Sequence, residues 1–578
     1  MVLGAAALDS LIGVGSGGRR RCRDGAWRSR SEDGVASRCW QSRGPASPAQ
    51  GSPRSLPQPP LESSSCLVSV GFVHLVGAGP GDPGCLTLRG RECLEQADVI
   101  IYDQLANPVL LNFAPPDAVR IFAGKHGSGP QILTQAEINQ LIVEQARAGR
   151  RVVRLKGGDP MLFGRGAEEA EALVEVGVAF EIVPGVSSAL AVPAFAGIPV
   201  THRDWVSGLT ILTGHEARNK EPSRVRWDLV ATAGNTIVLL MGVVQMKRNL
   251  AELRAAGLSD DTPAAAISWG STPRQTTLVG TVGSLADLVE AESLRPPVTV
   301  VIGEVVRLRQ RIAWFERRAL FGRRILVTRA RHQAGRLSAA LAALGAEPVE
   351  VPVIEIADPP DLAPFRQALE RLPVYDWIVL TSENGVERFV NGLIAAGRDL
   401  RDLHRARLAA IGPATARALA ARHLRADLVP EEFVAEGLID AFGPLGIEGQ
   451  RILLPRAAGA RAILPEALRA RGAQVDEVET YRSRMPVDAI ERARNAIEAG
   501  ALDAVTFTSS STVDHLLDVL AATGSDAASD WLQQARIACI GPITAATARR
   551  RGLQVDVVAE PYTIEGLVAA LKGLFAAD

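Results

Sequence analysis

The stretch Arg151–Gly166, RVVRLKGGDPMLFGRG, joins an apolar run to a glycine-rich turn. The apolar residues stop at Leu155, and the polar loop Lys156–Pro160 follows at once. Glycines in such a loop permit positive φ and let a ligand approach the backbone closely. In open α/β proteins, ligands bind where the strands end, at the carboxyl edge of the sheet. The stretch therefore predicts a strand that delivers a binding loop to such an edge.

Three more transitions from apolar strand to polar loop surround this one. They are Phe72–Val76 into Gly77–Gly84 (GAGPGDPG), Val99–Ile101 into Tyr102-Asp103, and Phe180–Val183 into Pro184–Ser188. The first loop departs from the dinucleotide-binding fingerprint because Asp82 occupies the place of the third glycine. Alone it would indicate only a tight turn. Together, the four loops predict a small-molecule site on an α/β sheet.

The second half of the chain repeats itself at a displacement of 127 to 129 residues. The matching pairs are Arg324–Val327 with Arg451–Leu454, Leu380–Ser382 with Phe507–Ser509, Ile411–Thr415 with Ile540–Thr544, and Glu436–Leu438 with Glu565–Leu567. A solenoid is excluded because its repeats have only about 20 to 50 residues. The long period predicts two similar lobes.

Composition narrows the class of protein. A length of 578 residues predicts several domains, at about 150 residues each. The formal net charge of −1 argues against general attraction to nucleic acid or lipid. No apolar run approaches the roughly 18 residues that a membrane helix needs. The six cysteines show no C-x-x-C pair, which predicts reduced thiols and no metal site. We therefore expect a soluble cytoplasmic protein with small-molecule partners.

Residues 1–68 differ from the rest, since Ser, Gly, Pro and Arg dominate them. Such a segment lacks the periodic apolar surface that would offset the loss of chain entropy on folding. We predict a disordered extension. A transit peptide is the lesser alternative, because the segment also carries acidic residues, and a misplaced start codon is another.

Over about residues 70–310, the chain resembles the uroporphyrinogen-III C-methyltransferase family of tetrapyrrole methylases. The motifs that carry this resemblance are Val76–Asp82, Tyr102-Asp103, Gly124-Lys125, Gln135–Asn139, Arg151–Gly166, Val183–Gly185 and Gly197–Asp204. Their number and order argue against chance agreement. The resemblance implies two α/β subdomains with S-adenosylmethionine in the cleft between them. It also implies a homodimer, and transfer of two methyl groups to uroporphyrinogen III to give precorrin-2.

The resemblance also assigns roles to individual residues. Asp103 falls at the proposed proton acceptor and Lys125 at the proposed proton donor. The positions that match cofactor contacts are Pro80, Gly157, Gly158, Asp159, Leu162, Ser187, Ser188, Met241 and Gly270. Read without the family, Asp103 and Asp159 would be turn residues, the two serines would cap a helix, and Met241 would belong to the core.

The implied substrate carries eight carboxylates, which favours guanidinium groups with bidentate geometry. Arg154, Arg165 and Arg203 lie near the motif loops and are candidates for binding it. Arginines on solvated faces are the commoner case. The sequence departs from the family at Gln104, His126 and Met161-Leu162, and these changes bear on substrate contacts more than on methyl transfer.

The repeated half resembles uroporphyrinogen-III synthase, on Arg324–Arg329, Thr381–Val386, Thr508–Val513 and the two Ile-Gly-Pro loops. The resemblance implies two doubly wound lobes joined by a two-stranded ladder, which close hydroxymethylbilane to uroporphyrinogen III without a cofactor. Tyr481 matches the family's tyrosine that assists loss of the hydroxyl. Arg456, Ser509 and Thr544 are candidates for substrate contact. Their ordinary roles would be helix capping for the hydroxyls and packing for the tyrosine.

The sequence thus predicts an extension at 1–68, a methyltransferase domain at 69–315 and a synthase domain at 316–578. We expect a bifunctional enzyme that catalyses consecutive steps. The alternative is a methylase of another substrate, such as a later corrin, ribosomal RNA or diphthine, fused to a two-lobed binding or sensory module. The sequence leaves open the choice between sirohaem and cobalamin, and any channelling between sites.

Overall fold

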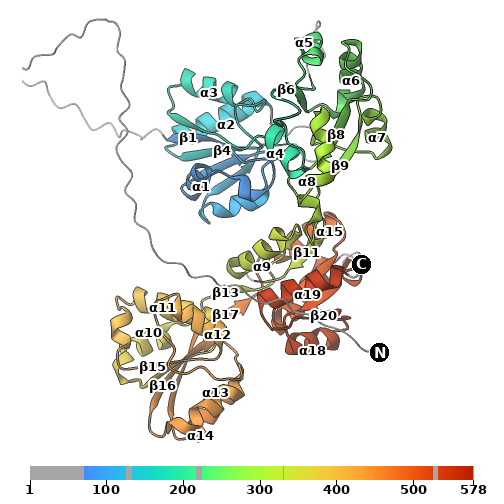
Figure 1. Cartoon of the computed structure of the whole chain (residues 1–578). Coiled ribbons are helices and arrows are strands. Elements are labelled where there is room, and N and C mark those ends of the chain that lie inside the picture. Colours follow the sequence, from blue (N-terminus) through green and yellow to red (C-terminus); the bar gives the residue numbers. More distant parts are fainter. Residues whose placement is uncertain (1–70, 125–132, 216–223, 330, 525–530, 577–578) are drawn as a thin grey trace, which may run out of the picture. The chain divides into compact units, whose positions relative to one another are not determined.

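The structure is a computed structural model that describes residues 71–124, 133–215, 224–329, 331–524 and 531–576. The chain divides into two units between Leu67 and Val68, and all described residues lie in the second. Four five-stranded sheets form in that unit (Figure 1). The predicted α/β class is therefore confirmed.

The first sheet is fully parallel, in the order β3-β2-β4-β1-β5. Its strands are β1 (Phe72–Gly77), β2 (Val99–Tyr102), β3 (Val119–Phe122), β4 (Arg151–Lys156) and β5 (Phe180–Val183), and its helices are α1 (Leu88–Glu95), α2 (Gln135–Arg147) and α3 (Gly166–Glu175). Val76 of β1 packs beside Leu94 of α1, while Leu75 packs beside Ile142 and Leu173 of α2 and α3. Alternation along the strand therefore gives the sheet a helix layer on each face (Figure 1).

The second sheet is mixed, in the order β6-β7-β10-β8-β9, with only β6 and β7 parallel. Its strands are β6 (Leu209–Thr213), β7 (Thr236–Leu240), β8 (Pro263–Ser268), β9 (Thr276–Thr281) and β10 (Val298–Ile302), and its helices are α4 (Ser188–Phe195), α5 (Trp227–Thr232), α6 (Met246–Ala255), α7 (Leu285–Ala291) and α8 (Arg309–Ile312). Helix α4 covers one face, and α6 and α7 cover the other. The two predicted α/β subdomains are thus present.

The third and fourth sheets follow in the second half of the chain, in the orders β12-β11-β18-β19-β20 and β13-β17-β16-β14-β15. The strands are β11 (Arg324–Val327), β12 (Glu347–Glu350), β13 (Glu355–Ala357), β14 (Trp377–Leu380), β15 (Arg407–Ala410), β16 (Arg451–Ala457), β17 (Gln474–Arg484), β18 (Ala504–Phe507), β19 (Arg536–Cys539) and β20 (Val557–Val558). Every pairing is parallel except that of β13 with β17, which forms the predicted two-stranded ladder.

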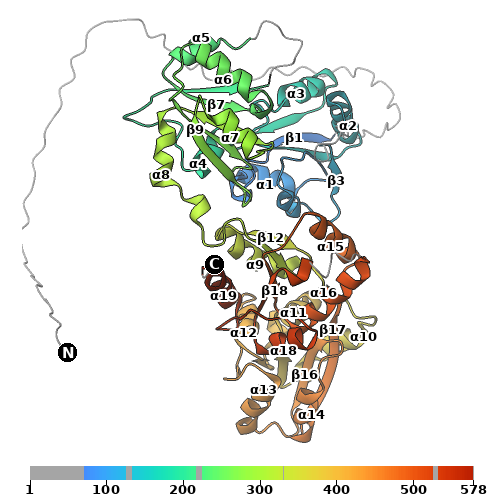
Figure 2. The same cartoon turned by 90° about the vertical axis from the view of Figure 1, so that its right-hand side faces the viewer.

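Helices cover both faces of these two sheets, which gives the predicted doubly wound lobes (Figure 2). Around the third sheet lie α9 (Arg331–Ala343), α15 (Ala489–Glu498), α16 (Ser510–Thr523), α18 (Pro542–Arg550) and α19 (Ile564–Ala576). Around the fourth lie α10 (Ala363–Glu370), α11 (Glu383–Ala395), α12 (Pro413–Ala420), α13 (Ala435–Phe442) and α14 (Ile463–Ala470).

The lobes do not coincide with the two sequence repeats. The third sheet joins β11 and β12 of the first repeat to β18, β19 and β20 of the second, and the fourth sheet makes the converse combination. The same contact fastens both junctions. Asp503 Oδ2 accepts a hydrogen bond from Arg324 N at 2.8 Å, and Asp376 Oδ2 accepts one from Arg451 N at 2.9 Å. Each repeat therefore completes its sheet with strands of the other.

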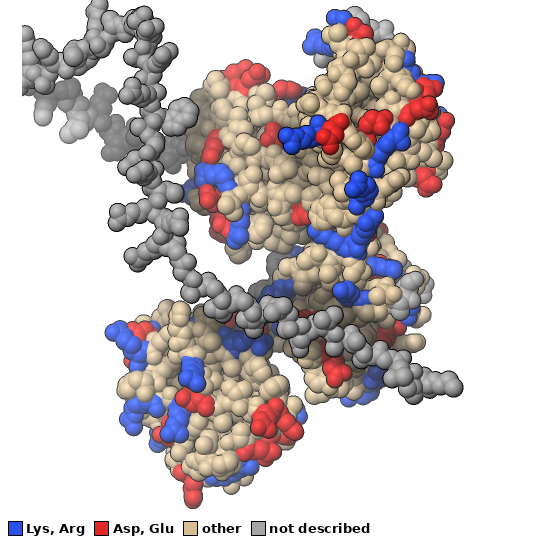
Figure 3. All heavy atoms as spheres, viewed as in Figure 1, with Lys and Arg blue, Asp and Glu red and all other residues tan. Residues whose placement is uncertain are grey.

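The described residues also bear on the kinds of partner. None of their helices combines the length and the apolar character that crossing a membrane demands. On the face drawn in Figure 3, Lys and Arg side chains are interspersed with Asp and Glu. This mixture agrees with the net charge of −1 and offers no extended basic surface on that face for nucleic acid.

The buried thiol of Cys539, on β19, predicts a pH dependence of stability. Burial raises the pKa of this thiol to about 11, from an ordinary value of 9.0. The folded state therefore disfavours the thiolate. The contribution of this buried thiol to stability is fully present below pH 9 and is lost as the pH rises toward 11. Between these limits, we expect the unfolding free energy of the natural protein to fall by about 2 to 3 kcal/mol more than that of Cys539→Ala. Unfolding curves of both proteins across this range check it; parallel pH profiles would contradict it.

Candidate functional site

The loops that follow β1 and β4 stay hydrogen-bonded beyond the ends of their strands. Gly79 N donates to Gly158 O at 3.2 Å, and Gly158 N donates to Gly79 O at 2.7 Å. Ala78 N also donates to Lys156 O at 2.7 Å. Backbone hydrogen bonds therefore join the two glycine-rich loops found in the sequence at the carboxyl edge of the first sheet.

Three glycines make this junction as close as a backbone allows. A Cβ added to Gly185, in the loop after β5, would lie 2.2 Å from Gly158 O and 2.6 Å from Gly77 Cα. Gly158 itself has φ +69°, a left-handed conformation that favours glycine. The loops of β1, β4 and β5 therefore meet without intervening side chains.

Asp159 ties two of these loops together. Its Oδ1 accepts a hydrogen bond from Met161 N at 2.8 Å, and its Oδ2 accepts one from Gly185 N at 3.0 Å. The carboxylate thus fastens the β4 loop to the β5 loop. A carboxylate has about four acceptor positions, so capacity for a ligand remains beside this structural use.

Asp103 lies at the end of β2 with its side chain 25% exposed. Its Oδ1 accepts hydrogen bonds from Leu105 N and Ala106 N at 3.0 and 3.3 Å. Its Oδ2 lies 3.6 Å from a terminal guanidinium nitrogen of Arg154. One oxygen is therefore held by the backbone, while the other faces a cation, in a side chain that is partly exposed.

Arg154 forms an ion pair with a buried glutamate. Its side chain is 4% exposed and donates from Nε to Oε1 of Glu169, on α3, at 3.1 Å. Lys156 Nζ donates to the same Oε1 at 2.8 Å, and Gln135 Nε2 donates to it at 3.3 Å. The Glu169 side chain is fully buried, and no described residue makes a hydrogen bond to its Oε2. One carboxylate thus holds two buried cations.

This arrangement changes the expectation for Arg154. The sequence placed it among arginines that bind substrate carboxylates, but its guanidinium also donates to the carbonyls of Ile101 and Leu155. Burial, together with the charge of Arg154, lowers the pKa of Lys156. Sequence reasoning did not single out Glu169; its position four residues before the buried Leu173 on α3 was the available signal.

The second subdomain reaches this edge through the loop between β8 and β9. Ser271 Oγ accepts a hydrogen bond from Asp82 N at 3.2 Å, and a Cβ on Gly81 would lie 2.7 Å from the Thr272 side chain. A Cβ on Gly270 would lie 2.3 Å from Val192 of α4. The loops of the two sheets are therefore packed together at this edge.

Backbone strain gathers in the same loops. Of the seven non-glycine residues with positive φ that the structure describes, four lie in the loops after β4 and between β8 and β9, and a fifth, Met241, follows β7. They are Phe163 (+54°), Arg165 (+59°), Met241 (+57°), Trp269 (+47°) and Ser271 (+66°). Such conformations cost about 1 to 3 kcal/mol each and concentrate at ligand sites. Met241 is 51% exposed at the end of β7, so it does not occupy the core position that its residue type alone suggested.

The remaining predicted residues of the first half have simpler surroundings. Ser187 caps α4 by accepting a hydrogen bond from Ala189 N at 3.2 Å. Arg165 is exposed and pairs with Glu168 through two hydrogen bonds. Arg203 is exposed, and Lys125 lies outside the described residues. Pro80, Gly157 and Leu162 are half-buried in the loops described above, and Ser188 is half-buried as the first residue of α4.

In the fourth sheet, Tyr481 lies on β17 and is 6% exposed. Its hydroxyl is 2.8 Å from Ser382 Oγ, and Ser382 also caps α11 by accepting from Gly385 N at 2.9 Å. Burial raises the pKa of Tyr481, so the phenol stays protonated at neutral pH. Ser382 belongs to the Thr-Ser motif of the repeat, and this bond links that motif to the predicted tyrosine.

The other candidates of this half are also locally engaged. Arg456 is buried, lies 3.1 Å from Glu477 Oε1 and donates to the carbonyl of Arg461 at 2.7 Å. Ser509 caps α16 through Thr512 N at 3.3 Å. Thr544 is buried in the first turn of α18. Among the described residues, no hydrogen bond joins Tyr481 to Ser509 or Thr544.

Comparisons with known proteins agree with these two halves. Residues 73–286 match the family described as Tetrapyrrole (Corrin/Porphyrin) Methylases, and residues 335–569 match Uroporphyrinogen-III synthase HemD. The porphyrin biosynthesis protein HemD of Ruminiclostridium josui is 38% identical over 505 residues, which are 87% of this chain and 97% of that protein.

Two further similarities concern the first half. The S-adenosyl-L-methionine-dependent uroporphyrinogen III methyltransferase of Methanosarcina barkeri is 50% identical over 238 residues, 41% of this chain and 93% of that protein. The crystal structure of uroporphyrin-III C-methyl transferase from Thermus thermophilus, complexed with S-adenyl homocysteine, has 37% identity and a TM-score of 0.35, and covers 41% of this chain and 100% of its own. The chain belongs to the porphyrin biosynthesis family in which a tetrapyrrole methylase precedes a uroporphyrinogen-III synthase, and both of its parts are members of enzyme families.

Proposed function

We propose that the chain catalyses two consecutive steps of tetrapyrrole synthesis. Its second half, residues 316–578, closes hydroxymethylbilane to uroporphyrinogen III. Its first half, residues 69–315, transfers two methyl groups from S-adenosylmethionine to that product, giving precorrin-2. The observation that carries the proposal is the convergence of glycine-rich and strained loops from both subdomains beside Asp103. Homodimer formation and a cytoplasmic location remain predictions.

The residues at this edge fit S-adenosylmethionine as the methyl donor. At Gly77, Gly158 and Gly185 no side chain covers the backbone, and these loops pack directly against one another. We assign its binding to these loops together with Asp159, Met241 and Gly270. When bound, it supplies a methyl group on a sulfonium, and the sulfur needs no metal to act as the leaving group. The chain's task is then alignment of the reacting atoms and exclusion of water.

Asp103 is the group we assign to the pyrrole proton that is lost after methylation. Its side chain is 25% exposed, and its Oδ2 lies 3.6 Å from the Arg154 guanidinium rather than in a backbone hydrogen bond. We expect Asp103→Asn to lower kcat/KM for uroporphyrinogen III by about 10²- to 10⁴-fold, while affinity for S-adenosylhomocysteine changes little. Asp117→Asn, at an exposed aspartate of the same domain, is the matched control. Unchanged turnover in Asp103→Asn would remove this residue from the mechanism.

In the second half, we assign Tyr481 to the loss of the substrate hydroxyl. A protonated phenol held by Ser382 is a suitable donor to a leaving oxygen. Tyr481→Phe should lower kcat for uroporphyrinogen III formation by about 10²-fold. Ser382→Ala keeps the phenol but removes its partner, so its smaller effect separates orientation from proton donation. Tyr562→Phe, at an exposed tyrosine, should behave as the natural protein. Equal rates for Tyr481→Phe and the natural protein would exclude the role.

One assay tests the whole proposal. The full chain is incubated with hydroxymethylbilane, with and without S-adenosylmethionine, and the products are separated by isomer and methylation state. We expect uroporphyrinogen III without the methyl donor and precorrin-2 with it. Uroporphyrinogen I alone would refute the synthase assignment. Unmethylated uroporphyrinogen III in the presence of the donor would refute the methyltransferase assignment.

A further inference from the structure

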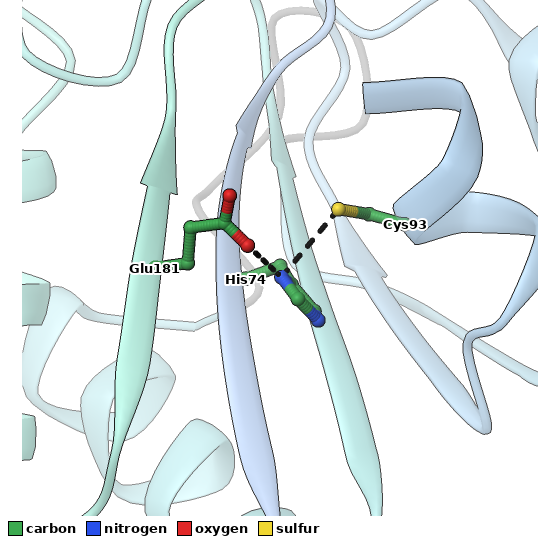
Figure 4. A group of neighbouring side chains, drawn as sticks. All are labelled: His74, Cys93 and Glu181. Atoms are coloured by element: carbon green, nitrogen blue, oxygen red, sulfur yellow. Dashed lines mark hydrogen bonds and ion pairs between the residues drawn. The ribbon is translucent and has the colours of Figure 1, made fainter. Parts of the chain in front are cut away.

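A thiol, an imidazole and a carboxylate converge on the first sheet, away from the loops of the proposed methyl-transfer site. They belong to His74 on β1, Cys93 on α1 and Glu181 on β5. One donor atom from each lies within 4.8 Å of the other two. Figure 4 shows Nδ1 of His74 turned toward both the Glu181 carboxylate and the Cys93 sulfur. We propose that these three side chains bind a zinc-like divalent metal ion.

The distances from Nδ1 of His74 suit such an ion. Nδ1 lies 3.2 Å from Glu181 Oε2 and 3.4 Å from Cys93 Sγ. Ligand atoms of a tetrahedral zinc lie about 3.3 to 3.5 Å apart, given bonds of about 2.0 Å to nitrogen and oxygen and about 2.3 Å to sulfur. Two edges of the tetrahedron are therefore nearly in place, and a modest approach of the sulfur and the carboxylate completes the third.

The surroundings supply access and an outer layer of contacts. Cys93 is 3% exposed, whereas the side chains of His74 and Glu181 are 13% and 35% exposed. An ion can therefore enter from the carboxylate side, where water would complete its coordination. Arg89 donates to both Glu181 oxygens, at 3.0 and 2.7 Å, and so fixes the carboxylate plane. Such contacts around ligands orient them and tune affinity.

The charges around the group are compatible with a metal, to which Cys93 would bind as the thiolate. Arg89 opposes a cation, but it is itself paired with Glu92 at 3.0 Å. The thiolate, Glu181 and Glu92 then balance the dication and Arg89.

The position of the group gives the ion a structural role. β1 enters the loop that begins at Gly77, α1 follows that loop, and β5 enters the loop that contains Gly185. A metal ion bound to the three elements would hold together the segments that flank both loops. The sequence predicted no metal site because the ligands stand far apart along the chain in no recognised spacing; the fold brings them together.

Cobalt titration tests the proposal, because a thiolate bound to Co²⁺ absorbs in the near ultraviolet. The full chain is stripped with a chelator under reducing conditions and titrated with Co²⁺, then with Zn²⁺. Since three cysteines lie outside the described residues, the readout is the difference between the natural protein and Cys93→Ser. We expect Cys93→Ser to lose one equivalent of Co²⁺ and its thiolate band, and Zn²⁺ to displace that equivalent. Cys85→Ser, at a half-buried cysteine of the same domain, should match the natural protein.

The other two ligands make the test independent of the cysteine. Glu181→Gln and His74→Ala should each weaken Co²⁺ binding at the Cys93-dependent site by about tenfold or more. Circular dichroism of the stripped proteins shows that each variant is folded; should His74→Ala fail, Glu181→Gln and Cys93→Ser carry the comparison. Bound Zn²⁺ should also raise the unfolding temperature of the natural protein but not of Cys93→Ser. Identical cobalt stoichiometry in the natural protein and Cys93→Ser, or unchanged affinity in Glu181→Gln, would show that the three side chains form only hydrogen bonds.

Discussion

Replacing Glu169 by alanine is expected to destabilise the first methylase subdomain by about 3 to 5 kcal/mol, because two buried cations lose their shared anion. Arg154 and Lys156 would remain in the interior, and neither can reach solvent without disrupting β4. Hydrogen exchange of peptides from β4 and α3 measures the loss directly. Peptides from the third sheet serve as an internal reference, because they belong to another core.

The adjacent residue on the same helix provides the matched control. Glu168 pairs with Arg165, but both side chains are about half exposed. Glu168→Ala should therefore change stability by no more than about 1 kcal/mol. Glu169→Gln keeps the shape but not the charge and should fall between the two. If Glu169→Ala proved as stable as Glu168→Ala, the buried pairs would not contribute to folding as argued.

Replacing Gly185 by alanine is the second large perturbation, expected to weaken S-adenosylhomocysteine binding by about 10²-fold. The new Cβ would lie 2.2 Å from Gly158 O and 2.6 Å from Gly77 Cα, so the loops must separate by roughly an ångström. Displacements of that size at a reacting centre cost about 10²-fold. Calorimetric titration with S-adenosylhomocysteine measures the change in Kd, and it does not depend on the tetrapyrrole substrate.

The control separates crowding from a general effect of the substitution. Gly177 lies after α3 at φ +70°, and a Cβ there would meet nothing within 4 Å. Gly177→Ala should cost about 1 to 2 kcal/mol of stability through its left-handed backbone while leaving the Kd unchanged. A Gly185→Ala protein with natural affinity would mean that these loops do not hold the ligand.

Much of the fold follows from local patterns. Apolar runs that end in Gly-containing loops predicted β1, β4 and β5, and the long repeat predicted two similar lobes; the doubly wound form of the lobes and the ladder between them were implied by the family resemblance. These signals succeed because a strand buried under helices on both faces is predominantly apolar, and because a close loop crossing requires glycine.

The partners of charged residues could not be predicted in the same way. Arg154 lies just before a motif loop, which suggested a substrate contact, yet its guanidinium is hydrogen-bonded to Glu169, which lies 15 residues later in sequence on α3. Likewise, the pairing of β11 with β18 could not be predicted. The strands of the two repeats have equivalent sequences, so either repeat could supply the neighbour of β11. Side-chain partnership and strand order are properties of the assembled fold.

The exchange of strands between the repeats also has a consequence for how the chain is made. All strands of the fourth sheet lie between Glu355 and Arg484, so this lobe is complete while later residues are still being synthesised. The third sheet starts earlier with β11 and β12 but must wait for β18 to cover the open edge of β11. The lobe begun first is finished last, and until then its unpaired strand edge is the part of the nascent chain most exposed to wrong pairing.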